Sequence, residues 1–174
     1  MTCDMDIQNI YNSIAELSRE IVRECTARSV KISTAESCTG GMISGAVTSI
    51  SGSSAVIELG VCSYSNRIKH EILHVPAEVL EQFTEYSVEC AAEMAKGVME
   101  LSGADYGVST TGVAGPTGGS AEHPVGEVCI AVSGRNGCRS ERFLFAQDDS
   151  TDRELIRALA AEKALSMLLC EIKK

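Results

Sequence analysis

Residues 34–41 read Thr-Ala-Glu-Ser-Cys-Thr-Gly-Gly, and this stretch decides the fold because it joins a strand-like segment to a helix-like one. Residues 31–34 suit a short strand, and apolar positions 43, 46, 47 and 50 share one face of a helix that begins near Thr39. In α/β proteins, ligands are commonly held where a strand gives way to a helix. The glycine pair lets backbone N–H groups approach a phosphate or carboxylate at the positive end of that helix.

A second glycine-rich loop, residues 110–119, reads Thr-Thr-Gly-Val-Ala-Gly-Pro-Thr-Gly-Gly and follows the strand-like segment 104–109. Alone, either loop is equally well explained as a tight turn. Together they favour a binding site, because both lie where a strand ends. We therefore expect the two loops to face one cleft and to bind a substrate through Ser37, Thr39, Gly40, Gly41, Thr111, Gly112, Gly115, Gly118 and Gly119.

The rest of the chain alternates between two apolar periodicities. Helical spacing is found over residues 7–25, 88–103 and 152–168, and strand-like sequence over 56–65, 125–132 and 142–145. The Asn136-Gly137 step indicates a hairpin between the last two strands, so the sheet must contain antiparallel pairs. This order predicts an α/β fold, a three-layer α/β/α domain with a mixed β-sheet.

Composition limits the class of protein. A length of 174 residues with 44% hydrophobic content suits one packed core, so we expect a single domain over 1–174. A net charge of -9 disfavours nonspecific nucleic-acid binding, which needs Lys and Arg to neutralise phosphates. No apolar run is long enough to span a membrane, and the start lacks a basic region followed by an apolar one. We expect a cytoplasmic protein with no nucleic-acid or membrane partner.

The eight cysteines are scattered and form no C-x-x-C pair, and the three histidines show no zinc-site spacing. We therefore expect reduced thiols, most of them acting as small hydrophobes, and no metal or cofactor. Glu36 either orients the hydroxyls of its loop or caps backbone donors, and we favour the structural role.

Ser54, Tyr64 and Lys69 lie between the two loops and are residue types that can act together in catalysis. A serine hydroxyl is a weak nucleophile until a base takes its proton, and a neutral lysine can serve where histidines are few. Burial or a neighbouring cation is needed to lower the pKa of the lysine so that its amine is neutral. A pyridinium substrate would supply such a cation. On spacing alone, Ser54 is more often a helix-flanking hydroxyl, Tyr64 a partly buried strand residue and Lys69 a solvated helix residue.

Several of these segments together resemble the CinA C-terminal domain family, in that family's order and over nearly the whole chain: 35–41, 52–54, 64–69, 111–119 and 124–126. Members of that family include nicotinamide-nucleotide amidases, which convert nicotinamide mononucleotide to nicotinate mononucleotide and ammonia. The resemblance implies Ser54 as nucleophile, Lys69 as base and Tyr64 as an assisting group. It also implies a small-molecule pyridine nucleotide as substrate, no cofactor, and a homodimer.

Two residues depart from the family pattern, and two other functions stay open. His123 stands where a lysine is common and Glu127 where a threonine is common, which lowers positive charge near the expected phosphate site. In one alternative, Cys38 is the nucleophile, because a thiol at a helix N-terminus can have a depressed pKa. In the other, the loops hold a nucleotide without turning it over, and the chain is a non-catalytic binding or interaction module.

Overall fold

The computed structural model describes residues 2–146 and 152–174, with side chains described from Ile7 onward. Five strands form one sheet in the order β2-β1-β3-β4-β5. They are β1 (Ile32–Glu36), β2 (Ile57–Cys62), β3 (Tyr106–Gly112), β4 (Glu127–Gly134) and β5 (Gly137–Leu144). β1 runs parallel to β2 and β3, whereas β4 is antiparallel to both of its neighbours. The sheet is therefore mixed, as the hairpin signal predicts.

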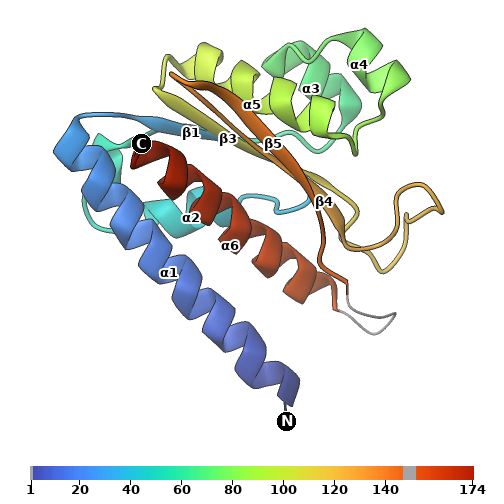
Figure 1. Ribbon diagram of the computed structural model, residues 1–174, viewed down its shortest axis with the longest axis horizontal. Coiled ribbons are helices and arrows are strands. Elements are labelled where there is room, and N and C mark those ends of the chain that lie inside the picture. Colours follow the sequence, from blue (N-terminus) through green and yellow to red (C-terminus); the bar gives the residue numbers. More distant parts are fainter. Residues whose placement is uncertain (1, 147–151) are drawn as a thin grey trace.

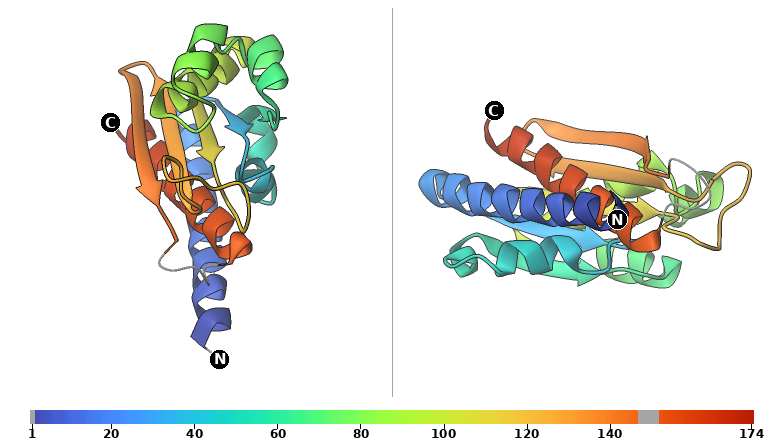
Figure 2. Two further views of the ribbon diagram at one scale, coloured as in Figure 1. Left: turned by 90° about the vertical axis from the view of Figure 1, so that its right-hand side faces the viewer. Right: turned by 90° about the horizontal axis from the view of Figure 1, so that it is seen from below.

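Helices cover both faces of this sheet (Figures 1 and 2). One face carries α1 (Thr2–Arg28), α2 (Met42–Thr48) and α6 (Arg153–Ile172). The other carries α5 (Val88–Ser102), with α3 (Asn66–Leu73) and α4 (Ala77–Gln82) packed against it. The predicted three-layer α/β/α architecture with a mixed sheet is confirmed.

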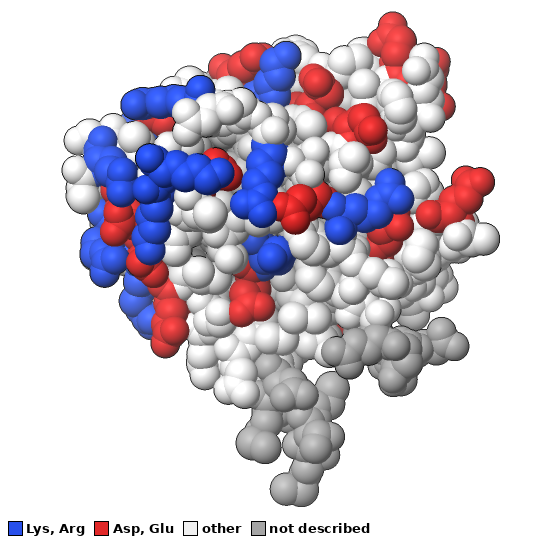
Figure 3. All heavy atoms as spheres, in the orientation of Figure 1, with Lys and Arg blue, Asp and Glu red and all other residues white. Residues whose placement is uncertain are grey.

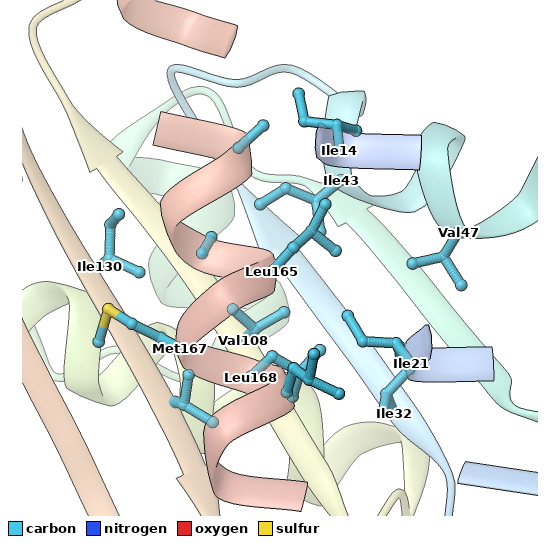
Figure 4. Close-up of a cluster of buried hydrophobic side chains, with 14 of the residues drawn as sticks. Ile14, Ile21, Ile32, Ile43, Val47, Val108, Ile130, Leu165, Met167 and Leu168 are labelled. Atoms are coloured by element: carbon cyan, nitrogen blue, oxygen red, sulfur yellow. The ribbon is translucent and has the colours of Figure 1, made fainter. Parts of the chain in front are cut away.

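The main core lies between α1, α6 and the sheet. Figure 4 shows side chains from α6, such as Leu165 and Leu168, pointing toward Ile21 of α1 and Ile32 of β1, and all four are fully buried. β1 and β4 are buried along almost their whole length, because helices cover them from both sides. β2, at the edge of the sheet, alternates between more and less exposed residues.

Local sequence signals explain where several elements begin and end. The Ser87 side chain accepts a hydrogen bond from the Cys90 amide and caps α5, and Gly103 ends that helix in the left-handed conformation. Residues Arg135 and Asn136 form the two-residue connection between β4 and β5, with Gly137 at a φ of +103°. The hairpin predicted from the Asn136-Gly137 step is confirmed.

The face drawn in Figure 3 mixes the two signs of charge, with Lys and Arg side chains lying among Asp and Glu side chains. Pairs such as Lys173 with Glu20 (2.5 Å) join the last residues of the chain to α1. Among the described helices, none combines the length and apolar character that a membrane crossing requires.

The parallel strands bring three connections to one edge of the sheet. Glu36, the last residue of β1, is in register with Cys62 of β2 on one side and Thr110 of β3 on the other. The segments after these three strands therefore meet at their carboxyl ends. This is the edge at which open α/β sheets hold ligands.

Candidate active site

A pocket of about 110 Å³ opens at this carboxyl edge. Its walls come from the segments after β1, β2 and β3, from the connection between α4 and α5, and from the start of α6. The lining residues are Ser37, Cys38, Tyr64, Asn66, Lys69, Glu85, Tyr86, Gly112, Ala114 and Arg153. A dry cavity of roughly 150 Å³ is known to hold one benzene ring. At about 110 Å³ the pocket is smaller than that cavity and, being open to solvent on one side, has room for one six-membered ring at most, so the rest of a nucleotide must lie outside it.

Lys69 lies on the first turn of α3, which Ser65 caps through the Ile68 amide. The side chain is 1% exposed, and its Nζ donates to Ser37 Oγ (3.3 Å) and to the Ser63 carbonyl (3.2 Å). Burial lowers the pKa of Lys69 below its ordinary value, and the nearby Cys90, Glu85 and Cys38 act in the opposite direction. A buried lysine with a lowered pKa is the kind of base that the sequence analysis required.

Ser37 occupies the first position after β1, where its amide donates to the Thr110 carbonyl (2.9 Å). The turn that follows it is held by Arg157 of α6, whose guanidinium donates to the carbonyls of Cys38 (3.0 Å) and Thr39 (2.8 Å). The hydroxyl that contacts the buried amine therefore sits on a turn fixed from two sides.

Ser54 lies at the other end of β2. It belongs to a single turn of 3-10 helix, η1 (Ser53–Ala55), which precedes the strand, whereas Ser63 and Tyr64 follow it. The six residues of β2 span roughly 20 Å at about 3.3 Å per residue. Within this chain the structure brings Lys69 to Ser37 and Tyr64, and not to Ser54. The GSS motif and the lysine motif lie close in sequence, but a whole strand separates them.

The start of α2 already holds an anion, supplied by the protein. The carboxylate of Glu36 is 1% exposed and accepts from the amides of Gly41 (2.9 Å) and Ser44 (2.8 Å), and from that of Ile43. The structural role favoured for Glu36 is confirmed. The expected phosphate position at this helix is therefore filled by a side chain.

Because Glu36 caps the start of α2, most residues of the first loop hold the turn together and do not line the pocket. The Thr39 hydroxyl donates to Glu36 (2.7 Å) and lies 2.8 Å from Thr110 Oγ1, fully buried. Gly40 lies beside the Arg157 guanidinium, and Gly41 adopts the left-handed conformation at the helix start. Of the first-loop residues predicted to bind substrate, only Ser37 lines the pocket. The others build the turn that presents it.

The residues of the second loop also form two groups: some line the pocket, and the others hold the surrounding structure in place. Gly112 lines the pocket, whereas the buried Thr111 hydroxyl donates to the Glu85 carbonyl (2.5 Å). The Gly115 carbonyl accepts from Arg153 (2.5 Å), so this glycine positions a lining residue. Gly118 and Gly119 lie beyond the lining, packed near Val113 and Val125. The prediction that both loops face one cleft holds for Ser37 and Gly112.

Five lining residues were missed by the motif analysis: Asn66, Glu85, Tyr86, Ala114 and Arg153. Tyr64, which was predicted, is 69% exposed at the rim, where its hydroxyl accepts from Arg153 (3.4 Å). No short motif marks Glu85 or Arg153, because each comes from a connection or helix end far away in sequence. The local feature of the sequence that could have indicated Glu85 and Tyr86 as lining residues is their position directly before the Ser87 cap of α5.

Cys38 also lines the pocket, but its thiol is fully buried. Burial raises the pKa of Cys38 to about 12, and the Glu36 carboxylate adds to the rise. The Cys38 alternative required a depressed pKa, and the structure shows the opposite shift. The thiol acts as a small apolar wall.

His123 and Glu127, the two departures from the family pattern, contact each other. His123 Nδ1 lies 2.8 Å from Glu127 Oε1, and its other ring nitrogen lies 3.2 Å from the Thr84 hydroxyl. The pair therefore ties the second loop to the connection that carries Glu85 and Tyr86. Within residues 2–146 and 152–174, no group of three or more His, Cys, Asp or Glu side chains has the arrangement of a metal site.

Comparisons with known proteins agree with this geometry. The model of the family described as CinA C-terminal domain matches residues 14–172. A protein of Enterobacter agglomerans named nicotinamide-nucleotide amidohydrolase PncC is 46% identical over 160 residues, which cover 91% of this chain and 95% of that protein. A CinA-like protein of Geotalea daltonii is also 46% identical, over 141 residues that cover 81% of this chain but 33% of that longer protein.

Solved structures show the same likeness. The competence/damage inducible protein CihA of Agrobacterium tumefaciens superposes with a TM-score of 0.88 at 42% identity, covering 93% of this chain and 96% of that one. The competence damage-inducible protein A of Klebsiella pneumoniae gives 0.86 at 34% identity, covering 92% and 97%. With a family model over residues 14–172 and relatives matched along most of its length, the chain belongs to the CinA C-terminal domain family.

Proposed function

We propose that this chain is a nicotinamide-nucleotide amidase, which hydrolyses the carboxamide of nicotinamide mononucleotide to nicotinate mononucleotide and ammonia. The observation that carries the proposal is the contact of 3.3 Å between the buried Lys69 amine and the Ser37 hydroxyl, in a pocket that fits one ring. The name of the Enterobacter agglomerans relative supports the choice of substrate. A single domain, a cytoplasmic location, a homodimer and the lack of a nucleic-acid partner stay predictions.

In this proposal Ser37 takes the nucleophilic role that the resemblance gives to Ser54. Ser37 Oγ attacks the carboxamide carbon while the neutral Lys69 amine accepts the hydroxyl proton. The tetrahedral intermediate collapses as the Lys69 ammonium returns that proton to the leaving nitrogen, which departs as ammonia. Water then attacks the Ser37 ester while Lys69 accepts one of its protons. The bond between the acyl carbon and Ser37 Oγ breaks as Lys69 returns that proton to Ser37 Oγ, and the acid product leaves.

The developing oxyanion needs hydrogen-bond donors placed in advance. The amide of Cys38 follows the nucleophile directly, and among the described residues no backbone carbonyl accepts from it. In hydrolases with a nucleophile on a strand-to-helix turn, this amide is one of the oxyanion donors. Arg157 holds the carbonyls of the same turn and thereby fixes how the Cys38 amide points.

The remaining lining residues suit the rest of the nucleotide. Arg153 lies at the rim beside Tyr64 and offers the guanidinium that a phosphate prefers. Because the pocket holds only the ring, the phosphate would extend toward this rim. Tyr64 then assists by contacting the substrate where it leaves the pocket.

Ammonia release and mass spectrometry of the nucleotide after incubation test the proposal directly. Wild type should convert the amide to the acid, Ser37→Ala should lose about 10⁴-fold or more in kcat, Ser54→Ala should stay within about twofold, and Cys38→Ala, which shortens one wall of the pocket, should lose far less than Ser37→Ala. Loss of turnover in Ser54→Ala with Ser37→Ala active would return the nucleophilic role to Ser54. Calorimetric binding of nicotinamide mononucleotide to folded wild type without any product would instead favour the non-catalytic module.

A further inference from the structure

The pocket contains one acidic side chain among its described lining residues, Glu85. Its other ionisable side chains are Lys69 and Arg153, together with the phenols of Tyr64 and Tyr86 and the thiol of Cys38. The mechanism proposed above gives no task to Glu85. A carboxylate is costly in a small pocket unless a cation lies near it. The question is therefore which cation Glu85 faces.

The backbone around Glu85 is fixed by contacts with the sheet and the second loop. Its carbonyl accepts from Thr111 (2.5 Å), and the next carbonyl, of Tyr86, accepts from the Cys129 thiol (3.1 Å). On the other side, Thr84 has a φ of +68° and contacts His123 (3.2 Å). A β-branched residue in this conformation persists only where the surroundings hold it. The Glu85 side chain is thus directed from a rigid segment.

Neighbouring side chains do not neutralise Glu85. It takes part in none of the ion pairs found among the described residues, in contrast to Glu127, which pairs with His123 and Arg142. Its effects on other groups show where it lies: it raises the pKa of Lys69 against the larger effect of burial, and it adds to the effect of burial in raising the pKa of Tyr86. Glu85 therefore lies in the same pocket as Lys69 and Tyr86 and close enough to influence both.

Aromatic side chains stand beside this carboxylate. Tyr64 and Tyr86 both line the pocket, and Tyr64 contributes to the raised pKa of Tyr86. The face of an aromatic ring attracts cations, by about 0.5–2 kcal/mol at sites of this kind. A carboxylate that shares a pocket with two tyrosines is an arrangement that attracts a flat organic cation.

On the premise that the chain is a nicotinamide-nucleotide amidase, we propose that Glu85 determines specificity by recognising the positive charge of a pyridinium ring, with Tyr64 and Tyr86 beside it. The substrate class is then the N-ribosylated pyridinium carboxamide 5′-phosphate, and a neutral ring of the same shape binds less well. The charges also orient the ligand. The cationic ring faces Glu85 and the phosphate faces Arg153, whereas the reverse orientation would place two anions together.

The experiment compares a cationic and a neutral ligand of one shape. KM and kcat for nicotinamide mononucleotide, and the inhibition constant of benzamide riboside 5′-phosphate, are measured in wild type, Glu85→Gln and Glu81→Gln. Glu81 is an exposed residue of α4 outside the pocket lining, so its variant is a control for the same change in charge. Glu85→Gln should lower kcat/KM for the cationic substrate ~10-fold, mainly through KM, given the Coulomb attraction between charges ~4 Å apart.

The inhibition constant of the neutral compound should change less than about twofold in Glu85→Gln, because no ring charge is lost. A second readout is the pH profile: removing the carboxylate that favours the Lys69 ammonium should move the acid limb of kcat/KM to lower pH. Equal changes for both ligands, or no change for either, would overturn the assignment. If wild type fails to hydrolyse nicotinamide mononucleotide, the proposed function fails, and calorimetric dissociation constants for the two ligands then test Glu85 by themselves.

Discussion

Replacing Lys69 by methionine should separate activity from stability. Lys69 is 1% exposed, and within the described part of the chain its amine makes two long contacts, 3.3 Å to Ser37 Oγ and 3.2 Å to the Ser63 carbonyl. If Lys69 is the base for Ser37, its loss should lower kcat about 10³-fold or more. Methionine has a similar length and no charge, so it fills the same space.

The expected change in the free energy of unfolding is small because opposing effects are of similar size. Two hydrogen bonds contribute about 0.5–1.5 kcal/mol each, and the Ser63 carbonyl left without a donor costs about 1–3 kcal/mol. Against this, the variant no longer buries an amine, which costs about 1–3 kcal/mol, and it buries a further apolar side chain. We expect Lys69→Met to lie within about 2 kcal/mol of wild type at neutral pH.

The difference in stability between Lys69→Met and wild type should change with pH in a predictable direction. Burial lowers the pKa of Lys69 in the folded protein below its ordinary value of 10.5. Between the folded pKa and 10.5 the unfolded chain holds a proton that the folded protein lacks, so wild-type stability rises with pH across this window. Lys69→Met lacks that rise. Its stability relative to wild type should therefore be highest below the folded pKa of Lys69 and should decline toward pH 10.5.

Buried thiols add a second pH effect above pH 9. Burial raises the pKa of Cys25, Cys38 and Cys90 to about 12, so the stability they contribute is present below pH 9 and is lost as pH rises toward 12. Because Lys69 lowers the pKa of both Cys38 and Cys90, its removal also alters this loss, so the two proteins are compared below pH 9, where the thiols stay protonated in both the folded and the unfolded state. Urea unfolding of the two proteins at a series of pH values, analysed as the difference, isolates Lys69.

Steady-state ammonia release completes the measurement. Lys69→Arg serves as a second variant, because a guanidinium stays protonated and cannot act as the base. Retained turnover in Lys69→Met would refute the assignment of the base. A pH-independent difference in stability between Lys69→Met and wild type would refute the argument that burial lowers the lysine pKa.

Two further substitutions test the turn that presents Ser37. Glu36→Ala leaves three amides at the start of α2 without their acceptor and should cost roughly 3–5 kcal/mol in urea unfolding, so a loss below about 1 kcal/mol would show that water replaces the carboxylate readily. Arg157→Ala removes both guanidinium contacts to the turn and should lower kcat ~10–100-fold with a smaller change in KM, since a displaced nucleophile loses orientation before binding. An unchanged kcat would show that the turn holds without Arg157.

The periodicity of the sequence was sufficient to predict the architecture. Helical and strand-like spacing, the Ser87 cap, the Gly103 end and the Asn136-Gly137 hairpin each act over a few neighbouring residues, so they can be read locally. The two glycine-rich loops were correctly placed at strand ends. Parallel pairing of β1 with β2 and β3 then brings those ends to one edge.

The identity of the serine beside Lys69 could not be read in this way. Ser54 and Lys69 are 15 positions apart and Ser37 and Lys69 are 32 apart, yet the register of β1 with β2 brings the more distant pair together. The structural role of the first loop could not be predicted from the sequence either. A helix start near two glycines predicts an anion, but only packing reveals that Glu36 supplies it.

The sequence by itself determined the order of elements, the family and the two loops, because these depend on local periodicity and on motifs of a few residues. Only the tertiary structure decided which side chains share the pocket, because Ser37, Lys69, Glu85 and Arg153 come from four separate segments. The burial that lowers the pKa of Lys69 is likewise a property of the packed molecule, since desolvation requires neighbours from β1, α3 and α5.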